Sequence, residues 1–172
     1  MINDHREIIV VAHDMRSIHN VGSLLRTAEG LGITELVFSG YTPHPAFEGD
    51  TRLPHVALRQ TNQIHKTALG AESMVKWRYA ADIKAVIEQY KDNGYEVIAL
   101  EQTNDAVPLP DYHVPEKLVI VLGREVEGLE DDIIEACSST VVIPMFGSKE
   151  SFNVVEAATM AMYHARFSIL QD

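Results

Sequence analysis

Residues 118–132 read LVIVLGREVEGLEDD, and this stretch decides the expected fold. Leu118–Leu122 is a continuous apolar run, which is typical of a strand buried on both faces of a parallel sheet. Gly123 follows at once, and a glycine after such a strand lets a ligand approach the backbone closely. Glu130–Ala136 begins with acidic residues and has the pattern of a short helix. The succession predicts an α/β unit.

Strands and helices alternate on both sides of this stretch. Strands are predicted at Glu7–Ala12, Glu35–Ser39, Tyr95–Leu100, Leu118–Leu122 and Thr140–Ile143, and helices at Asn20–Leu31, Gln63–Leu69, Ala81–Lys91, Glu130–Ala136 and Val154–Leu170. Because strands separated by helices pair in parallel, we expect an α/β fold with a mostly parallel sheet and helices on both faces. Residues 40–62 are rich in turn formers and are expected to be a long surface loop.

Composition favours one soluble domain. The chain has 172 residues, 46% of them hydrophobic, without an internal repeat or a linker-like stretch, so residues 1–172 are expected to form a single domain. Its one cysteine, Cys137, lies in an apolar pattern and is interpreted as a buried thiol, which suits the reducing cytoplasm. The apolar run near the N-terminus is too short for a signal peptide or a membrane span. We therefore expect a cytoplasmic protein that does not contact membranes.

The formal net charge of −11 argues against a general nucleic-acid-binding surface, since polyanions favour basic surfaces. The charge is unevenly distributed, however. Residues 51–78 contain five basic residues and one acidic residue, a balance of +4, whereas residues 101–135 contain two basic and ten acidic residues, a balance of −8. The basic segment suits contact with RNA and the acidic one suits solvent or a cationic ligand, although a merely solvated loop fits the basic segment equally well.

The segment DMRSIHNVGSLLRTAEGLG, residues 14–32, places Asn20 and Gly22 at the expected start of a helix. Arg26 follows about one turn later, and on a helix Gly22 and Arg26 both fall on a side away from the apolar stripe that includes Leu24. A helix start presents free N–H groups, and with a guanidinium nearby it can hold a phosphate or a ribose. The structural alternatives are an N-capping role for Asn20 and a solvated surface position for Arg26.

The segment VVIPMFGSKESFNVVEAATMAMYHA, residues 141–165, runs from a strand to the last helix. Ser151 and Asn153 stand at the start of that helix, where Ser151 can also serve as a simple cap. Glu125, in the stretch quoted first, has the alternative of an ordinary exposed carboxylate. All three segments follow predicted strands, and the ends of parallel strands meet at one edge of a sheet. We therefore expect these residues to converge.

Taken together, these three segments resemble the motifs of a known family. NVGSLLRTA, GREVEGL and IPMFGSKESFNVVEAA closely resemble the three ordered motifs of the SpoU-type RNA 2′-O-methyltransferases, within the SPOUT superfamily. The resemblance covers almost the whole chain, and three motifs in order make coincidence improbable. This chain departs from the family at Phe152, where leucine is usual, and at Val155, where a small polar residue is common. Both departures are expected to change packing near the cofactor more than chemistry.

The resemblance implies a parallel α/β fold with a C-terminal trefoil knot, S-adenosylmethionine as cofactor, and a tRNA or rRNA substrate. It also implies a homodimer, of which the apolar last helix would form a natural part. No metal is expected, because the spacing of His44, His55 and His65 matches no metal-ligand pattern. The implied catalytic residues are Asn20, Arg26, Glu125, Ser151 and Asn153, and the implied cofactor-binding residues are Leu100, Gly123, Ile143, Met145, Ser151 and Phe152. Because a guanidinium resists deprotonation, Arg26 is expected to clamp phosphate and the developing alkoxide rather than act as a base.

Two other functions stay open from the sequence. One is a SPOUT enzyme that methylates a base nitrogen, which would keep the knot and the cofactor but change the acceptor. The other is a non-catalytic, cofactor-binding or ribosome-associated module that kept the knot, and the acidic net charge makes it less remote. The intact motif residues speak against the second alternative, and the sequence does not identify the modified nucleotide.

Overall fold

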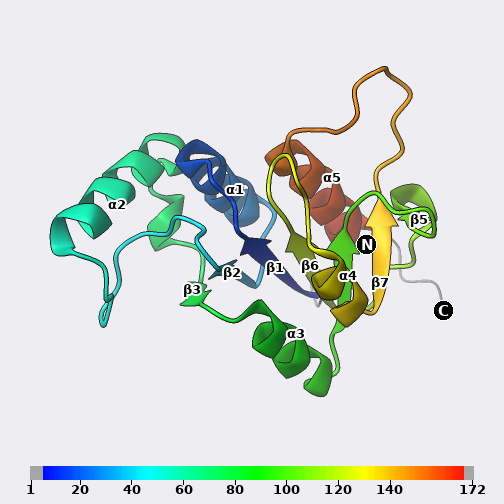
Figure 1. Cartoon of the computed structure of the whole chain (residues 1–172), viewed down its shortest axis with the longest axis horizontal. Coiled ribbons are helices and arrows are strands. Elements are labelled where there is room, and N and C mark those ends of the chain that lie inside the picture. Colours follow the sequence, from blue (N-terminus) through cyan, green and yellow to red (C-terminus); the bar gives the residue numbers. More distant parts are fainter. Residues whose placement is uncertain (1–5, 169–172) are drawn as a thin grey trace.

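The structure is a computed structural model and describes residues 6–168. At its centre lies a seven-stranded sheet in the order β3-β2-β1-β6-β4-β7-β5, and every pair of neighbouring strands is parallel (Figure 1). The strands are β1 Glu7–His13, β2 Glu35–Ser39, β3 Trp77–Ala80, β4 Glu96–Leu100, β5 Val107–Pro108, β6 Lys117–Leu122 and β7 Ser139–Val142. The predicted parallel α/β fold is confirmed.

Helices cover both faces of the sheet, as predicted. They are α1 Ile18–Gly30, α2 Pro54–Ala68, α3 Ile83–Asp92, α4 Asp131–Ala136 and α5 Val154–Phe167, with two 3₁₀ turns at Ala71–Ser73 and Leu109–Asp111. One hydrophobic cluster contains the buried residues of α1, α2 and α5, and the other contains those of α3 and α4. In Figure 1, α1 and α5 accordingly lie on the opposite side of the sheet from α3.

The central strand β1 shows why the sheet has two cores. Val10 and Ala12 belong to the α1 side, whereas Ile9 and Val11 belong to the α3 side. All four side chains are at most 2% exposed. A strand buried on both faces has no polar alternation, which is why its continuous apolar run predicted it correctly.

The prediction of a long surface loop over residues 40–62 is wrong in two places. Residues 42–45 are buried, and the hydroxyl of Thr42 accepts a hydrogen bond from the N–H of Met15 at 3.1 Å and lies 2.9 Å from the carbonyl oxygen of Ala12. Helix α2 already begins at Pro54, a residue whose fixed φ and missing N–H suit the first helical turn. Proline is also a common turn residue, so Pro54 in a segment rich in turn formers does not by itself reveal the start of a helix.

Helix α1 begins at Ile18, earlier than predicted, because Ser17 rather than Asn20 is its N-cap. The Ser17 hydroxyl accepts a hydrogen bond from the N–H of Asn20 at 3.2 Å. Gly22, expected on the side away from the core, is buried against α2. A Cβ added to Gly22 would lie 2.0 Å from Oγ1 of Thr67 and 2.5 Å from the carbonyl oxygen of Ile64, so glycine permits the two helices to approach closely.

The single cysteine, Cys137, is buried as predicted, and burial raises the pKa of its thiol to about 11. The last helix was predicted to reach Leu170, which lies outside the described residues; the described helix ends at Phe167. Within residues 6–168, no helix is long and apolar enough to cross a membrane. The single domain and the trefoil knot stay predictions, although the late strand β6 does insert between β1 and β4.

Candidate functional site

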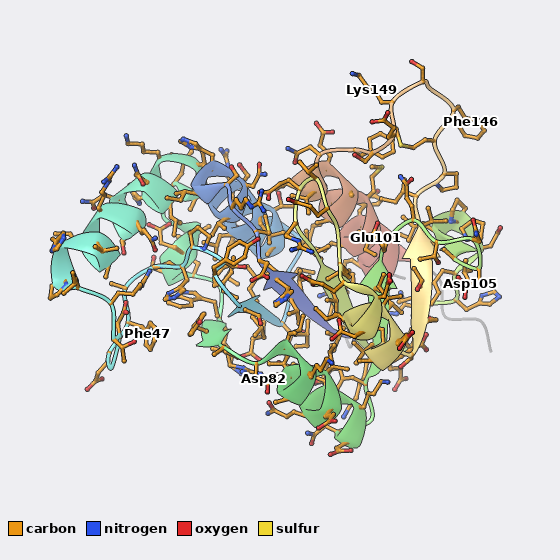
Figure 2. All side chains as sticks on the ribbon, in the orientation of Figure 1. Phe47, Asp82, Glu101, Asp105, Phe146 and Lys149 are labelled. Atoms are coloured by element: carbon orange, nitrogen blue, oxygen red, sulfur yellow. The ribbon has the colours of Figure 1, made fainter. Side chains whose placement is uncertain are left out.

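A pocket opens at the carboxyl ends of β4, β6 and β7, where ligands bind in open parallel sheets. Its walls come from these strand ends, from the loops that follow them, and from the start of α5. The lining residues are Leu100, Glu101, Gln102, residues 123–128, residues 141–143, Ser151, Phe152, Val154 and Ala157. The second and third sequence motifs are therefore brought together, as expected. Figure 2 shows Glu101 at this edge, below the loop that carries Phe146 and Lys149.

Two glycines shape the loop after β6. A Cβ added to Gly123 would lie 2.5 Å from the carbonyl carbon of Gly128, and a Cβ added to Gly128 would lie 2.1 Å from Oε2 of Glu101. Gly128 also has a φ of 69°, which side chains other than glycine rarely adopt. The N–H of Arg124 donates to the carbonyl oxygen of Gly128 at 3.2 Å and closes the turn. Only glycines permit this turn, and it places main-chain groups on the pocket wall.

Glu101 and Gln102, directly after β4, connect the loops that surround the pocket. The Glu101 carboxylate accepts a hydrogen bond from the N–H of Leu129 at 3.0 Å. The Gln102 side-chain amide donates to the carbonyl oxygen of Glu150 at 2.7 Å. Sequence reasoning missed both residues. Their position immediately after a predicted strand, which drew attention to Gly123, is the signal that would have identified them.

Glu125 links the second motif to the beginning of α1. Its carboxylate accepts hydrogen bonds from the N–H groups of Arg16 at 3.1 Å and Ser17 at 3.0 Å, and from the side-chain amide of Asn20 at 3.1 Å. Burial opposes ionisation, but the backbone N–H groups and the Asn20 amide outweigh it and lower the pKa of the Glu125 carboxyl. Glu125 is therefore a charged anchor for the entrance to α1, not the solvated carboxylate of the structural alternative.

Asn153 brings the third motif to the same place. Its side-chain nitrogen lies 3.5 Å from Oδ1 of Asn20, and its side-chain oxygen accepts a hydrogen bond from the N–H of Val155 at 2.8 Å. Asn153 is therefore the N-cap of α5, and the alternative in which Ser151 caps this helix is wrong. Through Asn20, one chain of contacts runs from Glu125 to Asn153 and joins all three motifs.

The expected cofactor-binding residues are distributed around the pocket. Leu100, Gly123, Ile143, Ser151 and Phe152 line it. Met145 does not, and it lies in the loop beyond, with its sulfur 4.0 Å from the Gln102 side-chain nitrogen. Ser151 and Phe152 are both exposed, and the Ser151 hydroxyl has no hydrogen-bond partner among residues 6–168. Five of the six expected residues therefore share one cavity.

Arg26 stands apart from the other catalytic candidates, because Glu125 and Ser151 line the pocket, and Asn20 and Asn153, which do not line it, are joined to Glu125 by side-chain contacts. It is exposed on α1 and does not line the pocket. It lies six positions after Asn20 on the helix, a rise of about 9 Å along the axis. Its guanidinium forms no ion pair within the described part of the chain. Arg26 therefore points a free positive charge outward.

The pocket is acidic. Glu101, Glu125 and Glu127 line it, and the positive charges nearby are already paired: Arg16 with Glu127 at 2.9 Å, and Arg124 with Glu130 at 2.7 Å. Such a lining favours a cationic ligand over an anionic one. Over the described residues, no three His, Cys, Asp or Glu side chains gather in a way that would hold a metal ion.

Solved structures share this fold. The "TrmH/SpoU tRNA modifying enzyme" of Aquifex aeolicus superposes with a TM-score of 0.76 at 21% identity, over 94% of this chain and 76% of that one. An "AdoMet bound rRNA methyltransferase" from Sinorhizobium meliloti also superposes with a TM-score of 0.76, at 19% identity, over 96% of this chain and 58% of that one. The molecule therefore has the α/β fold of the TrmH/SpoU proteins.

The family assignment rests on the sequence. The model of the "SpoU rRNA Methylase family" matches residues 7–163, and the chain belongs to this family. A "Putative TrmH family tRNA/rRNA methyltransferase" of Staphylococcus epidermidis is 28% identical over 155 residues, which cover 90% of this chain and 56% of that protein. The chain thus spans about half the length of this relative. The resemblance drawn from the three motifs is confirmed.

Proposed function

We propose that this chain transfers the methyl group of S-adenosylmethionine to a ribose 2′-hydroxyl of tRNA or rRNA. The observation that carries the proposal is the Glu125–Asn20–Asn153 chain of contacts, which gathers three distant motifs beside one pocket. Family membership and the printed names of the relatives support the reaction class. We place the activity in the cytoplasm, which suits a chain whose single cysteine is a buried free thiol.

The pocket residues fit the cofactor. Gly123 and Gly128 leave main-chain groups open to a nucleoside, and Leu100, Ile143 and Phe152 offer apolar contact for its rings. When bound, S-adenosylmethionine supplies a methyl group on a positively charged sulfur. The acidic lining around that position stabilises the cation, which gives the negative segment 101–135 a function.

Methyl transfer requires the attacking oxygen, the methyl carbon and the sulfur in line, so positioning supplies much of the rate. Ser151 lines the pocket and its hydroxyl has no hydrogen-bond partner among residues 6–168, so in this proposal it binds the ribose of the acceptor. Glu125 fixes Asn20, and Asn20 in turn contacts Asn153, so these three hold the acceptor side of the site in one arrangement. Their role is to orient, and none of them needs to change protonation state.

Arg26 enters the site from a second copy of the chain in this proposal. Its outward guanidinium binds a phosphate of the substrate and stabilises the alkoxide that develops at the 2′-oxygen. Helix α5 supplies a dimer surface, because Tyr163 is 59% exposed and Phe167 is 40% exposed, and the two rings pack together 4.6 Å apart. A homodimer would cover these rings and complete the site.

The experiment that tests the function uses total RNA from cells that lack the gene. Purified protein with methyl-labelled S-adenosylmethionine is expected to label this RNA at one site or a few sites. RNA from cells that carry the gene, already modified at those sites, is the matched control and should accept little label. A protein that binds the cofactor yet labels neither RNA would contradict the proposal and favour the non-catalytic module.

A further inference from the structure

A second cavity of about 400 Å³ lies outside the cofactor pocket, at the ends of β2 and β3. It is formed by the loop between β2 and α2, and we call it the aromatic pocket. Its side chains include Tyr41, His44, Phe47, Arg52, Gln60 and Tyr79. Figure 2 shows Phe47 on this loop, at the far end of the molecule from Phe146. The volume falls in the range of ligand pockets.

The rings of this pocket form a connected cluster that reaches the surface. His44 packs against Tyr79 with ring centroids 4.6 Å apart and against Phe47 at 5.6 Å. Tyr41, at the mouth, is 52% exposed and packs against no other ring within the described residues, while Phe47 is 42% exposed. Exposed aromatic faces of this kind are the surfaces on which proteins stack unpaired nucleic-acid bases.

Arg52 holds the loop in place, so the pocket exists before any ligand binds. Its guanidinium donates to the carbonyl oxygens of His44 at 3.0 Å and Pro45 at 3.1 Å, and it also pairs with Asp50 and Gln60. The ion pair with Arg52 lowers the pKa of Asp50, so this carboxylate stays ionised at the pocket wall and the guanidinium compensates its charge. Little ordering entropy remains to be lost when a ligand enters.

The polar groups and the surrounding charge suit a base on an anionic chain. Nδ1 of His44 lies 3.0 Å from the carbonyl oxygen of Pro45, so it carries the proton and leaves Nε2 as an acceptor for a base N–H. Burial lowers the pKa of His44, which keeps this acceptor neutral. The adjacent helix α2 has exposed Arg59 and Lys66 and contains no carboxylate, in a protein of net charge −11. This local charge favours a polyanion.

The aromatic pocket also lies on the same edge of the sheet as the cofactor pocket. The N–H of Tyr41 donates to the Asp14 carboxylate at 2.9 Å, and Tyr41 is close enough to Arg16 to raise the pKa of its guanidinium. The N–H of Arg16 in turn donates to Glu125 in the cofactor pocket. Three to four strand spacings separate the two pockets, about 15–20 Å. Consecutive nucleotides lie closer together than this, so the two pockets would serve different nucleotides.

We propose that the aromatic pocket binds an unpaired base of the RNA substrate, at a nucleotide distinct from the one that is methylated. The base stacks on Tyr41 and Phe47, and its N–H edge faces His44. This inference rests on the proposed function, since the RNA is the substrate of that reaction. It assigns to the loop between β2 and α2 the selection of an RNA segment that is single-stranded beside the modified site.

Trp77 provides the readout, because it is the only tryptophan of the chain and its ring lies 6.2 Å from those of both Phe47 and His44. The probe is a mixed-sequence, single-stranded 12-nucleotide RNA, and the same RNA annealed to its complement is the control. The single strand is expected to change Trp77 fluorescence with saturation, and the duplex to bind at least tenfold more weakly. Equal affinity for both forms would overturn the proposal.

Variants assign the binding to the pocket. Tyr41→Ala and Phe47→Ala are each expected to raise the Kd for the single strand at least fivefold, because a base stacked on an aromatic ring contributes that much or more. Tyr41→Phe retains the ring and should retain the affinity. Met74→Ala is the matched control, since Met74 is 71% exposed and does not line the pocket. Affinities of the Tyr41→Ala and Phe47→Ala proteins within twofold of the unaltered protein would overturn the proposal.

Phe47→Ala removes packing against Trp77, so S-adenosylmethionine affinity and thermal unfolding are measured to establish that the variants are folded. If Phe47→Ala proves to be unfolded, Tyr41→Ala, which removes no ring contact, is the variant that decides the test.

The two proposals fail in different experiments. If the unaltered protein methylates RNA and the variants bind it equally well, the aromatic pocket has no such role and the function stands. If single-stranded RNA binding depends on Tyr41 but no RNA is methylated, the proposed reaction fails and the pocket stands.

Discussion

Glu125 and Asn20 are 105 residues apart in the sequence, yet Oε1 of Glu125 accepts a hydrogen bond from the Asn20 amide at 3.1 Å. The same carboxylate accepts two backbone N–H groups at the entrance to α1. This contact is what converts two separate motifs into one site. It also gives Glu125, for which the sequence equally allows an ordinary exposed carboxylate, the clearest structural role.

Replacing Glu125 by glutamine should therefore disturb the site more than its small change in shape indicates. Glutamine keeps one oxygen acceptor but loses the charge, and hydrogen bonds to charged groups are about 1 kcal/mol stronger than neutral ones. We expect Glu125→Gln to lower kcat about tenfold or more, through misplacement of Asn20. Asp132→Asn is the control, because the Lys84–Asp132 pair is exposed, lies outside the pocket lining and should contribute under about 1 kcal/mol. Equal activities of the two variants would remove the positioning role.

The lowered pKa of Glu125 predicts a difference in acid stability. A carboxyl whose pKa is lower in the folded state stabilises the protein fully above its ordinary pKa of about 4.3, and this contribution is lost as the pH falls through the lowered value. The free energy of unfolding, measured in urea, should therefore fall more steeply below about pH 5 for the unaltered protein than for Glu125→Gln. The other carboxylates are common to both proteins and cancel in the comparison. Parallel pH profiles would show that Glu125 is not stabilised as its contacts imply.

Gly123→Ala should abolish tight cofactor binding. The added methyl would lie 2.5 Å from the carbonyl carbon of Gly128, so the turn on the pocket wall must open. Overpacking of this size costs about 1–3 kcal/mol, and we expect the Kd for S-adenosylmethionine to rise at least tenfold by calorimetry. Gly147→Ala is the matched control, because nothing lies within 4 Å of its added Cβ. A Gly123→Ala protein that binds the cofactor normally would mean that this turn does not form the binding wall.

Arg26→Ala should lose activity without losing stability or cofactor affinity. Arg26 is exposed and does not line the cofactor pocket, so its removal leaves both the fold and the cofactor contacts intact. Loss of one group that stabilises a developing oxyanion lowers kcat by about 10²- to 10³-fold. Arg26→Lys should recover only part of this, since an ammonium does not reproduce the planar guanidinium contacts. Near-normal turnover by Arg26→Ala would mean that Arg26 has no catalytic role.

Much of the fold was predictable because the sheet is buried on both faces. The apolar runs of β1, β2, β4 and β6 have no competing interpretation of similar length. Strand β3 is not predicted from the sequence, because Trp77–Ala80 lies at a sheet edge and includes Arg78, which interrupts the apolar pattern. The two-residue strand β5 has no pattern to detect.

The site was less predictable, because its decisive contacts join distant segments. Ser17 and Asn20 are both good caps by residue type, and only the position of the first turn decides between them. Gly22 is predicted outside the core because it adds no side chain to the apolar stripe of α1, and nothing in the sequence shows that Ile64 and Thr67 of α2 pack against it. The spacing of apolar residues indicates which face of a helix is buried. A glycine has no side chain and therefore adds nothing to this pattern, even where another helix packs against it.

The position of the transferred methyl group decides whether the acceptor is a ribose 2′-hydroxyl. RNA methylated by the purified protein with labelled S-adenosylmethionine is hydrolysed with alkali, which cleaves next to a free 2′-hydroxyl but not next to a 2′-O-methyl group. We expect the label to be recovered in alkali-resistant dinucleotides. Recovery of the label in mononucleotides would place the methyl group on a base and rule out the ribose as acceptor.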